Sequence, residues 1–441
     1  MSHLTRRGLL IAGAGVAAVA LQPEIAHATT PTTTRTVPFT LNATVLDGGE
    51  QVTSLTLATS DFGAIDPASL TTATFKVHAK ATSPITVAPG LIFNEYDLDR
   101  VVTKARLDHG KIVLDLQTTD GVVGGGTLGY LTRNSRNVLL NLVYTITQDA
   151  PLMLRSHGSL MLPGFTQSKL VDPEVDVYSH HVSSDRMKYR LFSPTQGGGW
   201  ERSSGHGKRP LIVWLHGGGE GGSLPDNYYD NESLLRANRG ALGFSTPEAQ
   251  KIFGGASVLA PQAESAWMAD GPGYAPRIKA IIDDLVKRYP IDASRIEVVG
   301  CSNGGYMSLY MSYAYPKAFS ASVPICPGAS PVFFTEAQLA SISTPTWLVQ
   351  SKADTVLPPR GQLHPSSCSD PRLVALAVRE RHLERHHVQR PLVVDLRRSQ
   401  RPVSQRQAHL AVDGVEATVH AQVVVRRHHH LAQRSTLSAR W

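Results

Sequence analysis

The sequence predicts a two-part protein in which an all-β sandwich precedes an α/β domain with a mainly parallel sheet and flanking helices. Short alternating strand patterns without a convincing helix fill residues 37–154, and apolar strand runs alternate with helical spacing in residues 175–360. The 441 residues are 41% hydrophobic and include 3 Cys. This composition excludes a disordered chain and a disulfide scaffold, and the length suffices for two or three domains.

The first 28 residues have the pattern of an export signal. Arg6 and Arg7 precede an apolar run over residues 8–21, and an A-x-A-like cleavage site ends at Ala28. Residues 5–10 resemble a twin-arginine signal, which implies export of the folded protein. Because the run is too short and too rich in Ala and Gly for a stable membrane span, we expect cleavage and secretion. A lone membrane anchor is the alternative.

The strand pattern of the first domain comes from apolar and polar residues that alternate at 53–57, 74–79 and 142–147. Several such strands without a helix indicate a small β-sandwich. The segment contains no catalytic constellation, so we expect a structural or substrate-facing role.

The second domain shows the alternation of strands and helices that builds a parallel sheet. The predicted strands are 211–215, 296–299, 321–325 and 346–349, and the predicted helices are 277–289 and 303–315. The first of these strands is continuously apolar, which is typical of a strand buried on both faces.

Residues 361–441 differ from both domains in composition. They hold 13 Arg, no Lys and 6 acidic residues, so the whole net charge of +7 lies here. The first 360 residues are electrically balanced and lack the basic stripe of a nucleic-acid-binding protein. Phe and Tyr are absent from the tail, which holds 9 of the 18 His. A solvated basic tail and a third domain stay open, but we favour a shifted reading frame near residue 360.

Gly300-Cys301-Ser302-Asn303-Gly304 forms a G-x-S-x-G motif between a predicted strand and a predicted helix. This context is typical of a nucleophile elbow, in which the glycines permit a sharp turn that exposes the serine hydroxyl above the sheet. The pentapeptide alone is a weak signal, and its placement strengthens it. We therefore predict Ser302 as a catalytic nucleophile.

A second glycine-rich turn, His216-Gly217-Gly218-Gly219, follows another predicted buried strand. In hydrolases with a nucleophile elbow, such a loop and the residue after the nucleophile offer backbone N–H groups to the oxyanion. Here these donors are Gly218 and Asn303. We interpret His216 as a brace of the turn, because a base this early would break the chain order Ser, acid, His.

Asp354 lies in the loop after the strand at 346–349, where the acid of a Ser-His-Asp triad belongs. We predict that it orients the catalytic imidazole, and a turn-capping Asp is the alternative. No His after Asp354 has the expected setting near Gly or Trp. If the tail is authentic, His420 or His428 is the candidate base. Otherwise the base is missing, and inactivity of the chain as encoded stays open.

Together these motifs make the chain resemble secreted α/β-hydrolase esterases with an N-terminal immunoglobulin-like domain. More distantly, it is similar to hydrolases of the prolyl-oligopeptidase and polyhydroxybutyrate-depolymerase types. The resemblance covers residues 37–359 and is carried by residues 214–220, 260–262, 291–296, 300–306 and 353–356. It implies an immunoglobulin-like sandwich, an α/β-hydrolase domain that is incomplete at its C-terminal end, and ester hydrolysis through a serine acyl-enzyme.

We therefore expect a secreted carboxylesterase that takes a small-molecule ester. No metal or cofactor is expected, because the sequence holds no metal-ligand spacing and no phosphate loop. A serine peptidase of the same clan and a non-catalytic protein that binds cell-wall polysaccharide are the alternatives. Cys301 and Cys326 end predicted strands that can be neighbours, so a disulfide stays open beside two buried free thiols, which we favour.

The coding DNA around codon 360 tests the origin of the tail. We expect another frame that continues with Tyr, Gly, Trp and a His, which would supply the final strand, the final helix and the base. A mass spectrum of the native protein that ends at Trp441 would contradict the frame shift.

Overall fold

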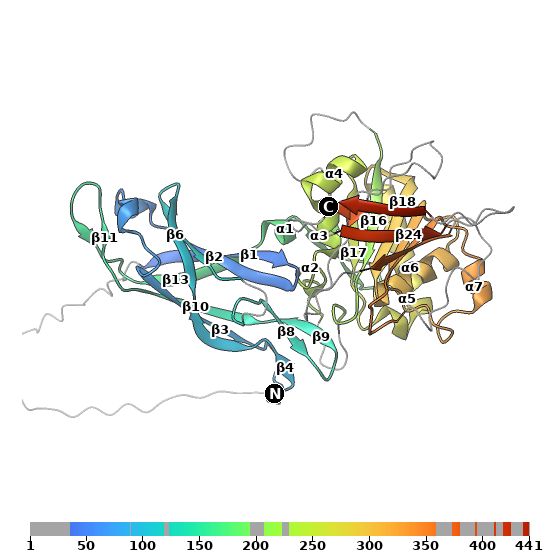
Figure 1. Cartoon of the computed structure of the whole chain (residues 1–441), viewed down its shortest axis with the longest axis horizontal. Coiled ribbons are helices and arrows are strands. Elements are labelled where there is room, and N and C mark those ends of the chain that lie inside the picture. Colours follow the sequence, from blue (N-terminus) through green and yellow to red (C-terminus); the bar gives the residue numbers. More distant parts are fainter. Residues whose placement is uncertain are drawn as a thin grey trace, which may run out of the picture. The chain divides into compact units, whose positions relative to one another are not determined.

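The computed structural model describes residues 36–358 apart from 89, 119–122, 195–206 and 223–228, together with five strands in the tail (Figure 1). The predicted export signal at residues 1–28 lies outside the described residues, as do His428 and the rest of the tail between the strands. Within the described part, no helix is both long enough and apolar enough to cross a membrane.

Residues 37–171 form an all-β module. Its strands are β1 (Val37–Leu46), β2 (Gly49–Leu57), β3 (Phe75–Thr82), β4 (Ile92–Phe93), β5 (Tyr96–Arg100), β6 (Val102–Asp108), β7 (Lys111–Leu116), β8 (Leu128–Leu131), β9 (Arg136–Leu139), β10 (Asn141–Gln148), β11 (Leu152–Met153), β12 (Ser159–Leu160) and β13 (Phe165–Val171), with 3₁₀ turns η1 (Ser60–Phe62) and η2 (Pro67–Ser69). One sheet has the order β13-β1-β2-β7-β6, and smaller sheets are β10-β3-β5, β4-β8-β9 and β11-β12. Strand β13 lies beyond the expected boundary at residue 154 and pairs in parallel with β1, so the module extends to Val171.

The sheets β13-β1-β2-β7-β6 and β10-β3-β5 share one hydrophobic core. Strand β3 buries Phe75, Val77, Ala79 and Ala81 and exposes the residues between them, as its alternating sequence predicts. Phe75 meets Phe165 of β13 edge to face, with ring centroids 6.0 Å apart. Each fully buried side chain of this size stabilises the fold by about 1.5–3 kcal/mol. The arrangement fits a sandwich, and its immunoglobulin-like type stays a prediction.

The second part is a mixed sheet flanked by helices. Its strands are β14 (Ser179–Val182), β15 (Lys188–Phe192), β16 (Arg209–Leu215), β17 (Ser257–Pro261), β18 (Ile291–Cys301), β19 (Ala321–Ile325) and β20 (Thr346–Ser351). Its helices are α1 (Pro173–Asp176), α2 (Ser233–Arg236), α3 (Gly240–Ser245), α4 (Pro247–Phe253), α5 (Gly271–Arg288), α6 (Asn303–Ala314) and α7 (Glu336–Ala340), with the 3₁₀ turn η3 (Trp267–Ala269). The strand order is β14-β15-β17-β16-β18-β19-β20-β21-β24-β25. Every pair from β17 to β21 is parallel, which confirms the mainly parallel sheet.

Strand β16 shows why this sheet needs helices on both faces (Figure 1). Leu211 and Val213 belong to one core with side chains of α5 and α6. Ile212 and Trp214 belong to another core with side chains of α2 and α3. Because successive residues of a strand point to opposite faces, the continuous apolar run at 211–215 is buried on both sides.

The tail contributes strands to the end of this sheet. These strands are β21 (Leu373–Arg379), β24 (Thr418–Val424) and β25 (Ser435–Arg440), whereas β22 (Val393–Val394) and β23 (Leu410–Ala411) form a separate two-stranded sheet. Strand β21 pairs in parallel with β20, and β24 and β25 follow in antiparallel order. His420 falls in β24 opposite Arg379. The origin of the tail in a shifted frame stays a prediction.

A buried ion pair and a hydrogen bond link the all-β module to the helices of the α/β part, and all these residues belong to one compact unit. Arg236 of α2 pairs with Glu50 of β2, whose side chain is fully buried and also accepts a hydrogen bond of 2.6 Å from Thr127. Arg239, directly before α3, donates to the carbonyl of Val45 in β1 at 2.9 Å and is held by two bonds of 2.6 Å to Glu174 of α1. Desolvation raises the pKa of Glu50 to about 7, although Arg236 lowers it.

Loss of the Arg236 charge tests this linkage. Since the partner carboxylate is buried, we expect Arg236→Leu to lower the free energy of unfolding by about 3 kcal/mol at pH 8. The loss should be smaller at pH 5, where the Glu50 carboxyl is neutral in the folded state and needs no counter-charge. Urea unfolding at both pH values measures the difference. Arg106→Leu, at a partly exposed pair with Asp115, is the control and should cost less than about 1 kcal/mol. Equal losses at both pH values for Arg236→Leu would contradict the charge argument.

Candidate active site

Ser302 lies at a sharp turn between β18 and α6. Its backbone has φ 55° and ψ −112°, in the positive-φ range that non-glycine residues rarely adopt. The N–H of Ser302 donates to the carbonyl of Ile325 on the neighbouring strand β19, at 2.8 Å, and this bond fixes the turn against the sheet. The strain of such a conformation costs on the order of 1–3 kcal/mol and persists only where the surroundings hold it.

Two flanking glycines make this turn possible. A Cβ atom at Gly300 would lie 2.3 Å from the carbonyl oxygen of Gly304. A Cβ atom at Gly304 would lie 1.9 Å from the carbonyl oxygen of Leu215, at the end of β16. Only glycine therefore allows α6 to begin this close to the two strands.

The glycine-rich turn after β16 lies beside the serine. A Cβ atom at Gly217 would be 3.6 Å from the carbonyl oxygen of Cys301, whereas one at Gly218 would meet no atom within 4 Å. Among the described residues, neither the N–H of Gly218 nor that of Asn303 has a hydrogen-bond acceptor, and the Ser302 hydroxyl has no partner. The structure thus brings together a partly exposed serine and a glycine turn with open space at Gly218.

His216 is held inside the turn and cannot act as a base there. Its Nδ1–H donates to the carbonyl of Gly217 at 2.8 Å, and its Nε2 accepts from the N–H of Ala263 at 3.1 Å. The ring also packs on Trp267, with centroids 4.8 Å apart. Burial lowers the pKa of His216 to about 4, so the imidazole is neutral. His216 therefore braces the turn through both ring nitrogens.

Glu220 is a second brace of the glycine turn, and the sequence assigned it no role. Its carboxylate accepts from the N–H of Gly217 at 3.2 Å and from Nδ2 of Asn238 at 2.7 Å. Desolvation raises the pKa of this buried carboxyl to about 8, although both hydrogen bonds lower it. The sequence signal that could have indicated this role is an acidic residue directly after a run of three glycines.

Asp354 follows β20 and lies at the same carboxyl edge of the sheet as Ser302. Its Oδ1 accepts from the N–H groups of Val356 at 2.9 Å and Leu357 at 2.8 Å, and its Oδ2 accepts from Nε2 of Gln350 at 3.0 Å. The carboxylate therefore caps its own turn, the alternative open from the sequence. Among the residues whose side chains the structure describes, no histidine is hydrogen-bonded to Asp354 or to Ser302.

Cys301, the last residue of β18, and Cys326, directly after the neighbouring strand β19, are free thiols with their Sγ atoms 3.4 Å apart. The sequence allowed either a disulfide or two free thiols, and the structure contains the free thiols. Hydrogen bonding to Cys326, burial and the more distant Asp354 carboxylate raise the pKa of the Cys301 thiol. This thiol stays protonated and is no competing nucleophile beside Ser302.

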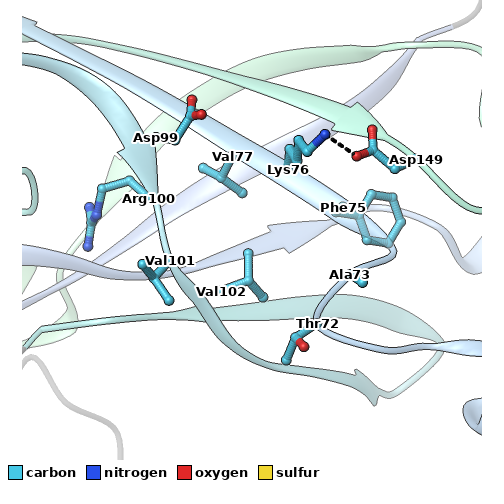
Figure 2. A pocket seen from close by; sticks show the side chains of 10 residues that line it. All are labelled: Thr72, Ala73, Phe75, Lys76, Val77, Asp99, Arg100, Val101, Val102 and Asp149. Carbon is cyan, nitrogen blue, oxygen red and sulfur yellow. Dashed lines mark ion pairs between the residues drawn. The ribbon is translucent and has the colours of Figure 1, made fainter.

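A shallow surface pocket of about 390 Å³ lies in the all-β module, away from Ser302 (Figure 2). It is lined by residues of β3, β5 and the segments beside them, including Phe75, Val77 and Val102. Figure 2 shows Lys76 paired with Asp149 at its rim. None of its lining residues belongs to the α/β part, so it takes no part in the chemistry of the turn. No cluster of three or more metal-binding side chains occurs among the described residues.

No family model matches the chain. It is 38% identical over 58 residues to poly(3-hydroxyalkanoate) depolymerase C of Paucimonas lemoignei, a match that covers 13% of this chain and 14% of that protein. It is 30% identical over 129 residues to acylamino-acid-releasing enzyme 1 of Oryza sativa subsp. japonica, covering 27% and 15%. The chain therefore spans about a sixth, at most, of the length of these curated relatives.

A solved thermostable esterase matches 73% of this chain and 85% of its own, with a TM-score of 0.58 and 24% identity. This likeness decides the fold. The chain has the α/β-hydrolase fold. Because residues 175–358 make up less than half of the chain, the α/β-hydrolase part alone cannot account for the match, which extends into the all-β module.

Gly304, which has no space for a side chain, and Gly218, which has space for one, provide a matched test of the turn. We expect Gly304→Ala to lower the free energy of unfolding by several kcal/mol, because its Cβ would overlap the Leu215 carbonyl. Gly218→Ala should change it by about 0.5 kcal/mol or less, since nothing lies near its Cβ position. Urea denaturation compares the two. Equal stability of both variants would contradict the close approach of α6 to β16.

The buried carboxyl of Glu220 predicts a pH-dependent stability. Its folded pKa of about 8 exceeds the ordinary value of 4.5, so the folded state favours the neutral acid. Its contribution is complete below about pH 4.5 and is lost as the pH rises through 8. Glu220→Gln cannot ionise, so unfolding measured between pH 5 and 9 should show a flatter decline than in the wild type. Glu248→Gln, at an exposed position, should leave the decline unchanged, and a wild-type decline in Glu220→Gln would refute the assignment.

Proposed function

We propose that the chain is a secreted serine hydrolase, a carboxylesterase that acts through an acyl-enzyme on Ser302. The observation that carries this proposal is the positive-φ turn at the partly exposed Ser302, beside a glycine turn; among the described residues, the N–H groups of Gly218 and Asn303 have no acceptor. A strained serine between a strand and a helix is the geometry of a nucleophile elbow. Secretion rests on the export signal expected in residues 1–28.

In the proposed reaction, Oγ of Ser302 forms a bond to the ester carbonyl carbon while its proton passes to a base. The N–H groups of Gly218 and Asn303 hold the negative oxygen, and each such donor lowers the barrier by about 3 kcal/mol. The tetrahedral intermediate then collapses, and the alcohol leaves with the proton. Water repeats the sequence on the acyl-enzyme and releases the acid.

The base and its orienting acid are the open part of this mechanism. Asp354 is proposed to orient a catalytic imidazole, and the bonds to its own turn keep it at the edge of the sheet near Ser302. The candidate His428 lies outside the described residues, and only the backbone of His420 is described. Without an imidazole, Ser302 keeps only the residual catalysis that the oxyanion donors and substrate binding supply.

Ester substrates have support from two similar proteins, one named a poly(3-hydroxyalkanoate) depolymerase and one an esterase. The packing of the sheets β13-β1-β2-β7-β6 and β10-β3-β5 around one hydrophobic core supports the proposal of an immunoglobulin-like N-terminal domain. A serine peptidase is the second candidate, because the rice relative is named an acylamino-acid-releasing enzyme. Rates on short acyl esters and on peptide amides separate the two candidates.

Ser302→Ala with an imidazole supplement tests the nucleophile and the base together. We expect the wild type to cleave short acyl esters, and we expect added imidazole to increase its rate at least tenfold by acting as a base toward Ser302. Ser302→Ala should show no imidazole-dependent gain beyond the reaction of imidazole itself. Ser308→Ala, one turn further along α6, is the control and should respond as the wild type does.

Three results would overturn parts of this proposal. An imidazole response retained by Ser302→Ala would remove Ser302 as nucleophile. A fast reaction in the wild type that imidazole does not raise would place an effective base within the chain. Turnover of peptide amides with none of acyl esters would favour the peptidase.

A further inference from the structure

The hairpin of β8 and β9 is the part of the all-β module that contacts the glycine turn. Its turn, from Thr132 to Ser135, is closed by a hydrogen bond of 3.3 Å between the Ser135 N–H and the Thr132 carbonyl, and Ser135 has φ 50°. The sheet order β4-β8-β9 makes β9 an edge strand. An edge strand presents N–H groups that its own sheet does not use.

One of these edge groups reaches the glycine turn directly. The N–H of Asn137 donates to the carbonyl oxygen of Gly219 at 2.6 Å. Gly219 has φ +88°, and a Cβ atom there would lie 3.3 Å from the Ser135 carbonyl and 3.5 Å from both Nδ2 of Asn137 and the ring of Tyr130. The hairpin therefore packs on Gly219 with backbone and side chains.

The hairpin is itself fastened to the α/β-hydrolase part. Thr127, directly before β8, donates from Oγ1 to the Glu50 carboxylate at 2.6 Å, and Glu50 pairs with Arg236 of α2. Two separate contacts, one at the base of the hairpin and one on β9, thus hold it against the α/β part. A hairpin held at two points can act as a rigid support.

Three consecutive glycines need such a support. Glycine has the widest backbone freedom of any residue, so a free glycine run would sample many orientations of its N–H groups. An oxyanion donor is effective only when it is held in place before the reaction. His216 and Glu220 hold the start of the turn through Gly217. The Asn137 bond holds its other end at Gly219.

We propose that the β8–β9 hairpin is a positioning element of the oxyanion site, and that the Asn137 N–H orients the Gly218 donor by fixing Gly219. This inference rests on the proposed hydrolase function. It gives the N-terminal module a role in the reaction, at a distance from the reacting atoms and without contact to the substrate.

Asn137→Pro tests the proposal because it deletes one N–H group. In register, Asn137 lies opposite Tyr130, but its N–H points out of the hairpin to Gly219, so proline removes no bond between β8 and β9. Arg133→Pro is the matched control, since the second position of a tight turn accepts proline. Asn137→Ala keeps the N–H and removes only the amide side chain.

Hydrogen–deuterium exchange of the full-length protein gives a readout that needs no activity. In Asn137→Pro, amides of residues 216–220 should exchange about tenfold faster than in the wild type, while those of β8 stay protected and show that the hairpin is folded. For short acyl esters, kcat should fall about tenfold with KM unchanged, because the donor acts on the developing oxyanion. Arg133→Pro and Asn137→Ala should match the wild type in both measurements.

The outcomes separate this proposal from the hydrolase proposal. Unchanged exchange of residues 216–220 in Asn137→Pro would overturn the positioning role, whatever the activity. Faster exchange with unchanged kcat would also overturn it, because the turn would then be mobile without cost. If the wild type cleaves no ester even with imidazole, the hydrolase proposal fails, and the exchange data still show whether the hairpin holds the turn.

Discussion

The close approach of α6 to the carboxyl end of β16 is the constraint on which the candidate site depends. The Cα atom of Gly304 lies so near the Leu215 carbonyl that no side chain fits between them. This contact forces the chain to turn within one residue, and Ser302 takes the strained conformation that results. The same contact brings the end of β16, and hence the glycine turn, beside the serine.

Around this contact the protein places groups that hold the backbone without adding charge. His216 is neutral because burial lowers its pKa, and it uses both ring nitrogens as fixed hydrogen-bond partners. Burial favours the neutral acid of Glu220 as well. A site that must stabilise a developing negative oxygen is served by such surroundings, because a nearby carboxylate would oppose that charge.

Local sequence patterns predicted the helices and strands of the α/β part, but they could not predict contacts between residues far apart in the sequence. The predicted strand 321–325 agrees with β19 residue for residue. Helix α5 begins six residues before the predicted start at 277, because Asp270 caps it and Pro272 suits the first turn, although glycines there obscure the pattern. Strand β18 begins at Ile291, which lies opposite Arg209 of β16, and a register shift then places Ile296 opposite Leu211, so the polar residues between the two isoleucines hide the start of the strand.

At the site, the sequence predicted that Ser302, the glycine turn and Asp354 each lie directly after a strand, because each motif follows an apolar run. The partners of the Asp354 carboxylate could not be predicted, because a side chain can cap its own turn or reach across to another residue from the same position. The contact of Asn137 with Gly219 joins residues about 80 positions apart, and no local pattern encodes it.

The long separation in sequence between Asn137 and Gly219 has a consequence for the order of folding. Pairings between distant segments close late in folding, because a long loop must first be ordered. A chain with only its parallel sheet complete would already contain the serine turn, yet its three glycines would still lack their anchor on β9. Such an intermediate would turn over more slowly than the native protein, so that full activity would be reached only when the two parts of the chain have docked.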